Sequence, residues 1–391
     1  MNGITTSDGL LAAGGATATA DRASRLASVT LALVQPGDTV LYLLLPLYAD
    51  SFGVSLSEAG LLLAANRLVR IAGYGWVARS YERFGPRTAC LAAALGAIGA
   101  TLGYAVFSGV AALLVARLLW GLSFAALNIA TQTLATADAH RASRRSGRSR
   151  SIIAAGPMLG LLAGAVIAQL AGPRVVFMAL AVIALAALPI AVRLPAGRGH
   201  SVMTVGRRLR LPSPLDVWSF VQGLTLDGVF VVGLAVLARA ASPNDATLAA
   251  GCALALRYAG EIVLGPPSGA VAEGFGASRL LILLSLASAV AYAAIGAGIL
   301  WTGVVAVVLL RGMLAPLAAP VAASANPGAT RVIAIARMAT WRDLGAGVGP
   351  LLAGIVLPVA PVALYFACAA ILAAATLALA GLSVNAWRRG R

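Results

Sequence analysis

Residues 78–87, ARSYERFGPR, form a short charged stretch between two long apolar runs. A second version, GAVAEGFGASR, stands at residues 269–279 and repeats the Glu, Phe and Gly of the first after 191 residues. A charged connection that recurs between apolar segments is typical of a chain built from two related halves. The pattern predicts a duplicated membrane protein.

The composition agrees with that interpretation. The chain of 391 residues is 60% hydrophobic and 11% charged, with a mean hydropathy of +0.91. Soluble domains carry about 25% charged residues, whereas a membrane-spanning helix needs about 20 apolar ones. The length therefore allows roughly a dozen spans, and it leaves no room for a sizeable soluble domain.

The net charge of +16 comes entirely from arginine, because all 29 basic residues are Arg. These arginines cluster between apolar runs, where membrane topology explains them and nucleic-acid binding does not. Cys90, Cys252 and Cys368 have no metal-ligand spacing, and His140 and His200 stand apart in basic loops. A chain without Lys cannot form an ATP-binding P-loop. We therefore expect no enzyme activity, no metal and no cofactor, with the proton-motive force as the energy source.

The apolar periodicity predicts twelve helical spans rich in Ala, Gly and Leu, whose small side chains suit close helix packing. They are expected at 29–50, 57–78, 88–107, 111–135, 151–171, 174–195, 216–239, 246–270, 279–299, 302–325, 334–358 and 360–386. The expected domains are a disordered cytoplasmic tail at 1–28, a six-helix bundle at 29–195, a cytoplasmic linker at 196–215, a second bundle at 216–386 and a basic tail at 387–391.

Loop charge predicts the orientation. With twelve spans, the Arg clusters near residues 79–87, 141–150, 198–210 and 388–391 all fall on one side. The positive-inside rule then places both termini in the cytoplasm of a plasma (inner) membrane. We expect a multi-pass monomer in the lipid bilayer.

Further matches support the duplication. Val34-Gln35 in the first span is answered by Val221-Gln222 in the seventh, and LLAG at 161–164 recurs at 351–354. Asp38 corresponds to Asp227, and Arg117 to Arg311. These offsets all lie between 187 and 194 residues, as an internal duplication predicts.

Twelve spans in two halves, with this loop after the second and eighth, resemble the major facilitator superfamily of secondary transporters. The resemblance covers residue 29 to the end and implies an all-α membrane protein of two pseudo-symmetric six-helix bundles. The family's loop has the form G-x-x-x-D/E-R-x-G-x-R/K, and Ala78 stands here in place of its first Gly. The resemblance implies a gating motif, which latches the two halves together in the outward-open state. Its residues in the first copy are Glu82, Arg83, Gly85 and Arg87. In the second copy they are Gly269, Glu273 and Gly276, and Gly274 stands there in place of the Arg.

Two other motifs carry the resemblance. Arg117 and Gly121 match an Arg followed by a Gly in the family's fourth span. The fifth span resembles the motif of drug and metabolite antiporters, although it lacks the upstream glycines. Ordinary small-residue packing around a proline bend explains it equally well. The residues concerned are Gly156, Pro157, Gly160 and Gly164.

Charges inside the spans are the candidate functional groups, because a charge at mid-bilayer costs about 2.5 to 3.5 kcal/mol unless it faces a cavity or a partner. A carboxylate there can bind and release a proton as the cavity opens and closes; static ion pairs between helices are the alternative. The proton-coupling candidates are Asp38, Asp227, Glu261 and Asp343. The substrate-binding candidates are Arg67, Arg117, Arg257, Arg311 and Arg342, with Arg70 also inside a span.

Two of these groups need special notice. Arg257 and Glu261 lie four residues apart on one helical face and can neutralise each other.

The resemblance implies alternating access, with proton-coupled efflux of a small drug or metabolite as the first expectation. Excess Arg keeps open an importer or exchanger of an organic anion; vesicle assays in both orientations separate the two. A membrane receptor or scaffold without transport is the remote alternative.

Overall fold

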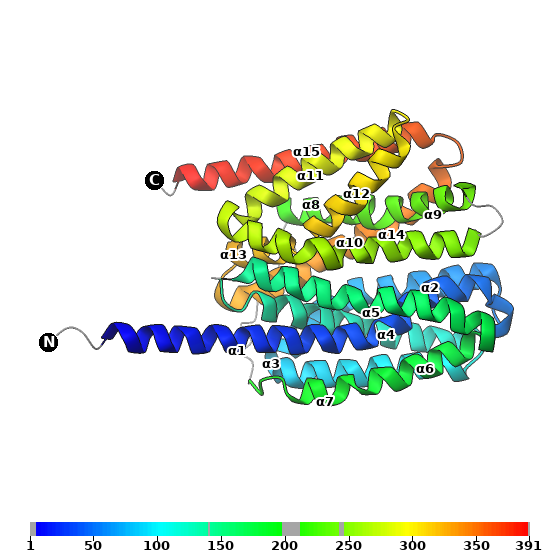
Figure 1. Cartoon of the computed structure of the whole chain (residues 1–391), viewed down its shortest axis with the longest axis horizontal. Helices are drawn as coiled ribbons and strands as arrows, with labels where there is room; N and C mark the ends of the chain where they lie inside the picture. The colour runs from blue at the N-terminus through cyan, green and yellow to red at the C-terminus, as the bar shows by residue number, and fades with distance from the viewer. Residues whose placement is uncertain (1–4, 140, 198–211, 242–245, 390–391) are drawn as a thin grey trace.

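The computed structural model describes residues 5–139, 141–197, 212–241 and 246–389, and all regular structure in these ranges is helical. Long helices lie side by side, and both termini lie at the same end of the molecule (Figure 1). The first half contains α1 (Thr5–Val34), α2 (Pro36–Leu47), the 3₁₀ turn η1 (Ala49–Phe52), α3 (Leu56–Val106), α4 (Val110–Ala135), α5 (Ala142–Ala171), α6 (Pro173–Leu185) and α7 (Ala187–Val192). The second half contains α8 (Pro214–Gln222), the π-helix η2 (Gly223–Val229), α9 (Phe230–Ala241), α10 (Ala246–Phe275), α11 (Ala277–Gly296), α12 (Leu300–Leu314), α13 (Ala318–Ala325), η3 (Gly328–Thr330), α14 (Arg331–Val356) and α15 (Pro361–Arg389).

Among the described residues, nine helical segments are long and apolar enough to cross a membrane. One of them, Glu58–Val106, contains two helical rods, because the chain breaks at Gly85. Two further long helices, α10 and α14, are not among these nine segments, and both carry charged side chains in mid-helix. Together these are consistent with the twelve spans that the sequence predicts. Each half has its own large hydrophobic core, and the core of the first half also takes in Val332, Ala336 and Ala339 of α14.

The charged stretch at 78–87 is not a loop. Helix α3 continues through it and departs from helical geometry only at Gly85, whose φ of 78° is open to glycine and costly for other residues. Pro86 then starts the next rod, because its fixed φ suits a first helical turn. The second copy breaks in the same way at Gly276, with φ of 95°, between α10 and α11.

The expected disordered tail is wrong for most of its length. Helix α1 begins at Thr5, because this Ala-rich segment favours a helix, and its later residues pack against the bundle. Ala27 is fully buried, and the Ser28 hydroxyl lies 2.7 Å from that of Ser149 on α5. Most of the expected linker at 196–215 and the end of the tail at 387–391 lie outside the described residues.

Helix α5 also begins earlier than the expected start at 151. Ala142 is its first residue, so the arginines that follow stand on a helix and not in a loop. The reason is that small residues let the first turns of α5 pack closely against α10 of the second half. A Cβ on Gly147 would overlap the carbonyl of Gly265, and one on Gly269 would overlap that of Ser143. Helices α5 and α10 therefore pack backbone to backbone, as small residues allow.

Near the end that holds the termini, polar contacts join the two halves. Arg144 of α5 pairs with Glu273 of α10 at 3.2 Å. Arg331 of α14 donates to the carbonyl of Thr136 at 3.0 Å. Among the described residues, no contact of Glu82, Arg83 or Arg87 crosses to the other half, and Arg87 donates to the Leu194 carbonyl in its own half. The second copy of the motif, through Glu273, supplies an ion pair between the halves at this end.

The π-helix η2 packs on α14 through glycines. A Cβ on Gly345 would overlap the carbonyl oxygen of Phe220 and lie 2.8 Å from the Leu224 nitrogen. We expect Gly345→Ala to destabilise the protein by about 1–3 kcal/mol, the usual cost of overpacking. Gly347→Ala on the same helix is the control, because nothing lies within 4 Å of its Cβ. Thermal unfolding in detergent measures both, and equal melting temperatures would contradict the prediction.

Candidate functional site

A cavity of about 220 Å³ lies between the two halves. Side chains from α2, α3 and α5 face others from η2, α10, α12 and α14 across it. All four predicted proton-coupling carboxylates line this cavity, and so do four of the five predicted substrate-binding arginines. The exception is Arg117, which is fully buried behind Asp38.

In the first half, Asp38 stands in the first turn of α2, directly after the break at Gln35. It forms an ion pair with Arg117 of α4 and accepts a hydrogen bond of 3.0 Å from the Asn66 amide. Arg117 also donates through Nε to the Leu62 carbonyl at 3.0 Å, and its guanidinium lies 5.1 Å from the Tyr42 ring centroid. These contacts fix Arg117 as the partner of one carboxylate and keep it away from the cavity.

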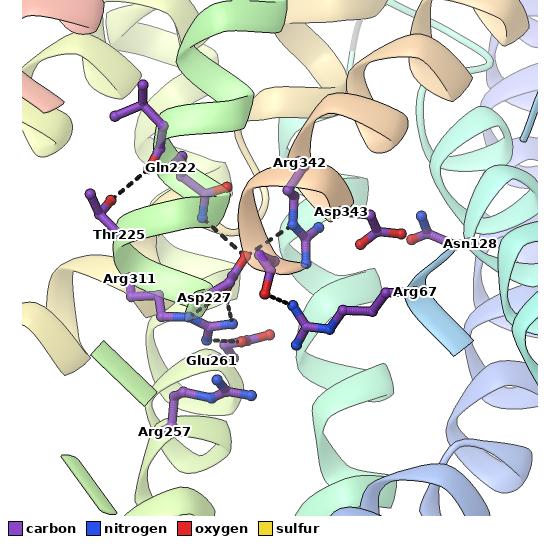
Figure 2. Close-up of polar contacts among 12 residues, drawn as sticks. Arg67, Asn128, Gln222, Thr225, Asp227, Arg257, Glu261, Arg311, Arg342 and Asp343 are labelled. Atoms are coloured by element: carbon purple, nitrogen blue, oxygen red, sulfur yellow. Dashed lines mark hydrogen bonds and ion pairs between the residues drawn. The ribbon is translucent and has the colours of Figure 1, made fainter. Parts of the chain in front are cut away.

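In the second half, Asp227 lies inside η2 and is held by two arginines (Figure 2). Its Oδ1 accepts from Nε and Nη2 of Arg311 at 2.9 and 2.6 Å, and its Oδ2 accepts from Nε of Arg342 at 3.0 Å. Arg311 also pairs with Glu261. The pair of Arg257 with Glu261, which their spacing allows, is not among the described contacts, because the Arg311 guanidinium lies between Glu261 and Asp227.

A third polar group links the halves beside the cavity. Asp343 of α14 accepts a 2.8 Å hydrogen bond from the Tyr74 hydroxyl and forms a 3.4 Å ion pair with Arg70, both on α3. Asn128 of α4 donates to Tyr74 at 3.4 Å. Arg67 donates to the Ala346 carbonyl across the same boundary. Movement of one half against the other must break these contacts.

Three cavity arginines have no carboxylate oxygen within 4 Å in the described part of the chain, namely Arg67, Arg150 and Arg257. Arg257 donates only to the neighbouring Tyr258 hydroxyl, at 3.3 Å, and its buried Nε has no partner. Figure 2 shows the Arg257 guanidinium without a contact to the residues drawn around Asp227. These groups are free to hold an anion.

Arg150 is the charged residue of the cavity that the sequence analysis did not identify as a candidate. It stands in a basic run that resembles a loop, and the earlier start of α5 carries it two turns into the helix. The small residues Ser143, Gly147 and Ser151 recur every four positions, which is a pattern of helix contact. Tyr74, Asn66 and Asn128 were also missed, because a single uncharged polar residue in a span gives little signal.

The glycines of the antiporter-like motif pack α5 against its own half. A Cβ on Gly156 would overlap the Ala32 carbonyl, and one on Gly160 would lie 2.7 Å from Cβ of Pro36. Gly164 faces Val40 in the same groove. The described contacts of this motif are those of small-residue helix packing.

Comparisons with known proteins agree with the fold. The model of the Major Facilitator Superfamily matches residues 27–207. The crystal structure of the human organic anion transporter MFSD10 (TETRAN) has a TM-score of 0.78 and 16% identity, covering 92% of this chain and 99% of that one. A bacterial homologue of the iron transporter ferroportin, in an outward-facing state, has a TM-score of 0.73 and 12% identity over the same shares of the two chains. A comparison with curated proteins gives no match.

Proposed function

We propose that this chain, which has the major facilitator superfamily fold, is a secondary transporter of a small organic anion. The observation that carries the proposal is the surplus of arginine at the cavity. Seven arginines, six of them lining the cavity and Arg117 behind them, stand against four carboxylates. Every carboxylate already has an arginine partner, so the surplus resides in Arg67, Arg150 and Arg257.

An unpaired guanidinium in a desolvated site is costly, and an anionic ligand removes that cost. Guanidinium forks bind carboxylate and phosphate groups through two parallel hydrogen bonds, which gives both strength and orientation. The three arginines without a described carboxylate partner come from α3, α5 and α10, on both sides of the cavity. An anion bound among them would therefore contact both halves of the transporter.

The cavity size favours a metabolite over a bulky drug, because about 220 Å³ is below the range of about 300–1,000 Å³ for drug-sized ligands. A metal cation is not favoured. The described residues contain no group of three His, Cys, Asp or Glu side chains that could hold one, and the site carries excess positive charge. The human neighbour that is an organic anion transporter by name supports the same substrate class.

Transport would proceed by rocking the two halves around the bound anion. The Asp343 contacts and the Arg67 bond to Ala346 close the boundary between α3 and α14, and substrate in the cavity competes for Arg67. One charge crossing about 100 mV is worth about 2.3 kcal/mol. The charge and gradient of the coupling ion therefore decide the direction in which the anion is transported. The proposal also includes proton coupling, export of the anionic metabolite, a monomeric state and cytoplasmic termini in a plasma membrane.

A matched ligand panel tests the substrate class. Purified protein is melted with small compounds of equal size that are anionic, zwitterionic, neutral or cationic. We expect saturable rises in melting temperature with the anions only, because a ligand that binds the folded state stabilises it by mass action. Stabilisation by the cations with none by the anions would remove the basis of the proposal.

Proton coupling makes a separate prediction for Asp38 and Asp227. The amide of Asp38→Asn or Asp227→Asn cannot be ionised, so each variant should lose substrate-driven proton movement in proteoliposomes by at least about tenfold, equal to about 1.4 kcal/mol. A pH-sensitive dye inside the vesicles measures it. Asp50→Asn, at a helix end away from the cavity, is the control. Undiminished proton movement in both cavity variants would show that these carboxylates serve only as static ion pairs.

A further inference from the structure

A second cavity, of about 290 Å³, lies between α1 and α5 near the end that holds the termini. Its lining does not overlap with that of the central cavity. Three arginines and three serine hydroxyls face it together with one carboxylate, that of Asp21. The arginines are Arg25, Arg145 and Arg148.

The carboxylate is already engaged. Buried Arg145 pairs with Asp21 at 3.4 Å and with Asp138 at 3.3 Å. Arg25 and Arg148 are exposed, and neither has a carboxylate within 4 Å in the described ranges. Ser24, Ser28 and Ser149 are buried and form the floor, where the Ser28 and Ser149 hydroxyls lie 2.7 Å apart. The cavity thus offers two free guanidiniums above a polar floor.

The level of this cavity in the bilayer follows from α5. Residues 152–171 are twenty uncharged, mostly apolar residues, and at about 1.5 Å per residue they cover the hydrocarbon thickness of about 30 Å. Arg148 stands one turn before that segment, and Arg25 of α1 lines the same cavity beside it. Both guanidiniums therefore lie at the level of lipid headgroups.

An apolar stripe on α5 continues from this position into the membrane. After Arg148 and Ile152, the outward side chains recur at helical spacing: Leu159, Leu162, Val166 and Leu170 are 61, 47, 56 and 83% exposed. A ligand bound at Arg148 that also has an acyl chain can lay the chain along this stripe. A soluble phosphate cannot use the stripe.

We propose that the α1–α5 cavity binds the phosphate of an anionic phospholipid. Arg25 and Arg148 hold the phosphate oxygens above the polar floor, and one acyl chain packs along Leu159 and Leu162. Arginine forks are suited to phosphate, and basic pockets between membrane helices on the cytoplasmic side hold anionic headgroups. The site is separate from the anion cavity of the transporter, so its test does not depend on the proposed substrate.

The test titrates purified protein in detergent with three ligands: phosphatidylglycerol, phosphatidylcholine with the same acyl chains, and soluble glycerol 3-phosphate. Native mass spectrometry counts the bound lipid, and thermal unfolding reports its effect. We expect saturable binding of about one phosphatidylglycerol, at least tenfold tighter than of the other two ligands. Arg25→Gln with Arg148→Gln should abolish that preference, whereas Arg22→Gln, an exposed arginine of α1 outside the cavity lining, should leave it intact.

Several results would overturn the proposal. Equal binding of phosphatidylcholine would remove the anionic requirement, and equal binding of glycerol 3-phosphate would leave a phosphate-ion site without a lipid. Unchanged lipid preference in the double variant, or the same loss in the Arg22→Gln control, would show that general surface charge is responsible. If the double variant does not fold, Arg148→Lys, which keeps the charge and loses the fork, should still weaken the preference, and the ligand selectivity of the unmodified protein is decisive by itself.

Discussion

Arg257→Gln is expected to weaken binding of the organic anion by roughly 10- to 100-fold. The guanidinium lines the cavity, has no carboxylate partner among the described residues, and keeps a buried Nε without a partner. A hydrogen bond to a charged group contributes about 1.5–3 kcal/mol, and about 1.4 kcal/mol corresponds to a factor of ten. Isothermal titration with the best anion of the panel measures the change, and Arg150→Gln should have an effect of similar size.

The control for this prediction is Arg79→Gln. Arg79 is exposed on α3 and bonds only the Gly75 carbonyl one turn earlier, at 3.2 Å. It carries the same charge without facing the cavity. Equal loss of affinity in Arg79→Gln and Arg257→Gln would mean that the overall charge of the protein attracts the anion and that the cavity arginines do not bind it.

Arg311→Gln is expected to destabilise the protein by about 3–5 kcal/mol, the cost of removing one partner from a buried ion pair. Arg311 is 7% exposed and serves both Asp227 and Glu261. Asp227 retains Arg342, whereas Glu261 loses its described partner. The expected result is a large drop in melting temperature, measured in detergent.

A double variant separates this effect from a general loss of packing. Glu261→Gln added to Arg311→Gln removes the stranded carboxylate and should recover part of the lost stability, as coupled neighbours do. Arg144→Gln breaks an exposed pair with Glu273, whose side chains are 42 and 27% exposed, and should cost less than about 1 kcal/mol. If the Arg311→Gln variant had the same melting temperature as the parent protein, the ion pairs of Arg311 with Asp227 and Glu261 would be exposed to water and not buried.

The sequence predicted the fold well, because the features that encode a membrane bundle are local. Twelve apolar runs, a glycine at each break of the repeated motif and recurring small residues all follow from composition and spacing. The boundaries that failed are those where packing against another helix decides. Thr5 to Ser28 and Ala142 to Arg150 look polar and flexible in isolation, yet both are helical. In the second segment the small residues fit a neighbouring backbone, because a Cβ on Gly147 would overlap the Gly265 carbonyl.

The sequence predicted which charged residues lie at the cavity, but it did not predict which arginine pairs with which carboxylate. The rule that charges inside spans face a cavity or a partner identified all four carboxylates. Which arginine serves which carboxylate depends on helix rotation, which one-dimensional spacing does not contain. Glu261 therefore pairs with Arg311, 50 residues away, and not with Arg257 on its own helix.

The π-helix at Asp227 was likewise invisible in the sequence. Glycines of α14 approach η2 so closely that a side chain at Gly349 would overlap the Leu224 carbonyl. Isolated π-turns occur frequently at functional sites. In this chain η2 carries the carboxylate held by both Arg311 and Arg342, whereas Arg117 is the one arginine paired with its counterpart Asp38 among the described residues. The two halves have thus diverged at the site itself.

The most direct test of the central claim is uptake of a labelled organic anion by proteoliposomes, with the parent protein beside the triple variant Arg67→Gln, Arg150→Gln and Arg257→Gln. We predict saturable anion uptake that the triple variant loses by at least about 100-fold, about 2.7 kcal/mol, while circular dichroism and melting show that it remains folded. Undiminished anion uptake by the triple variant, or uptake of the matched cation in place of the anion by the parent protein, would show that these arginines do not bind an organic anion.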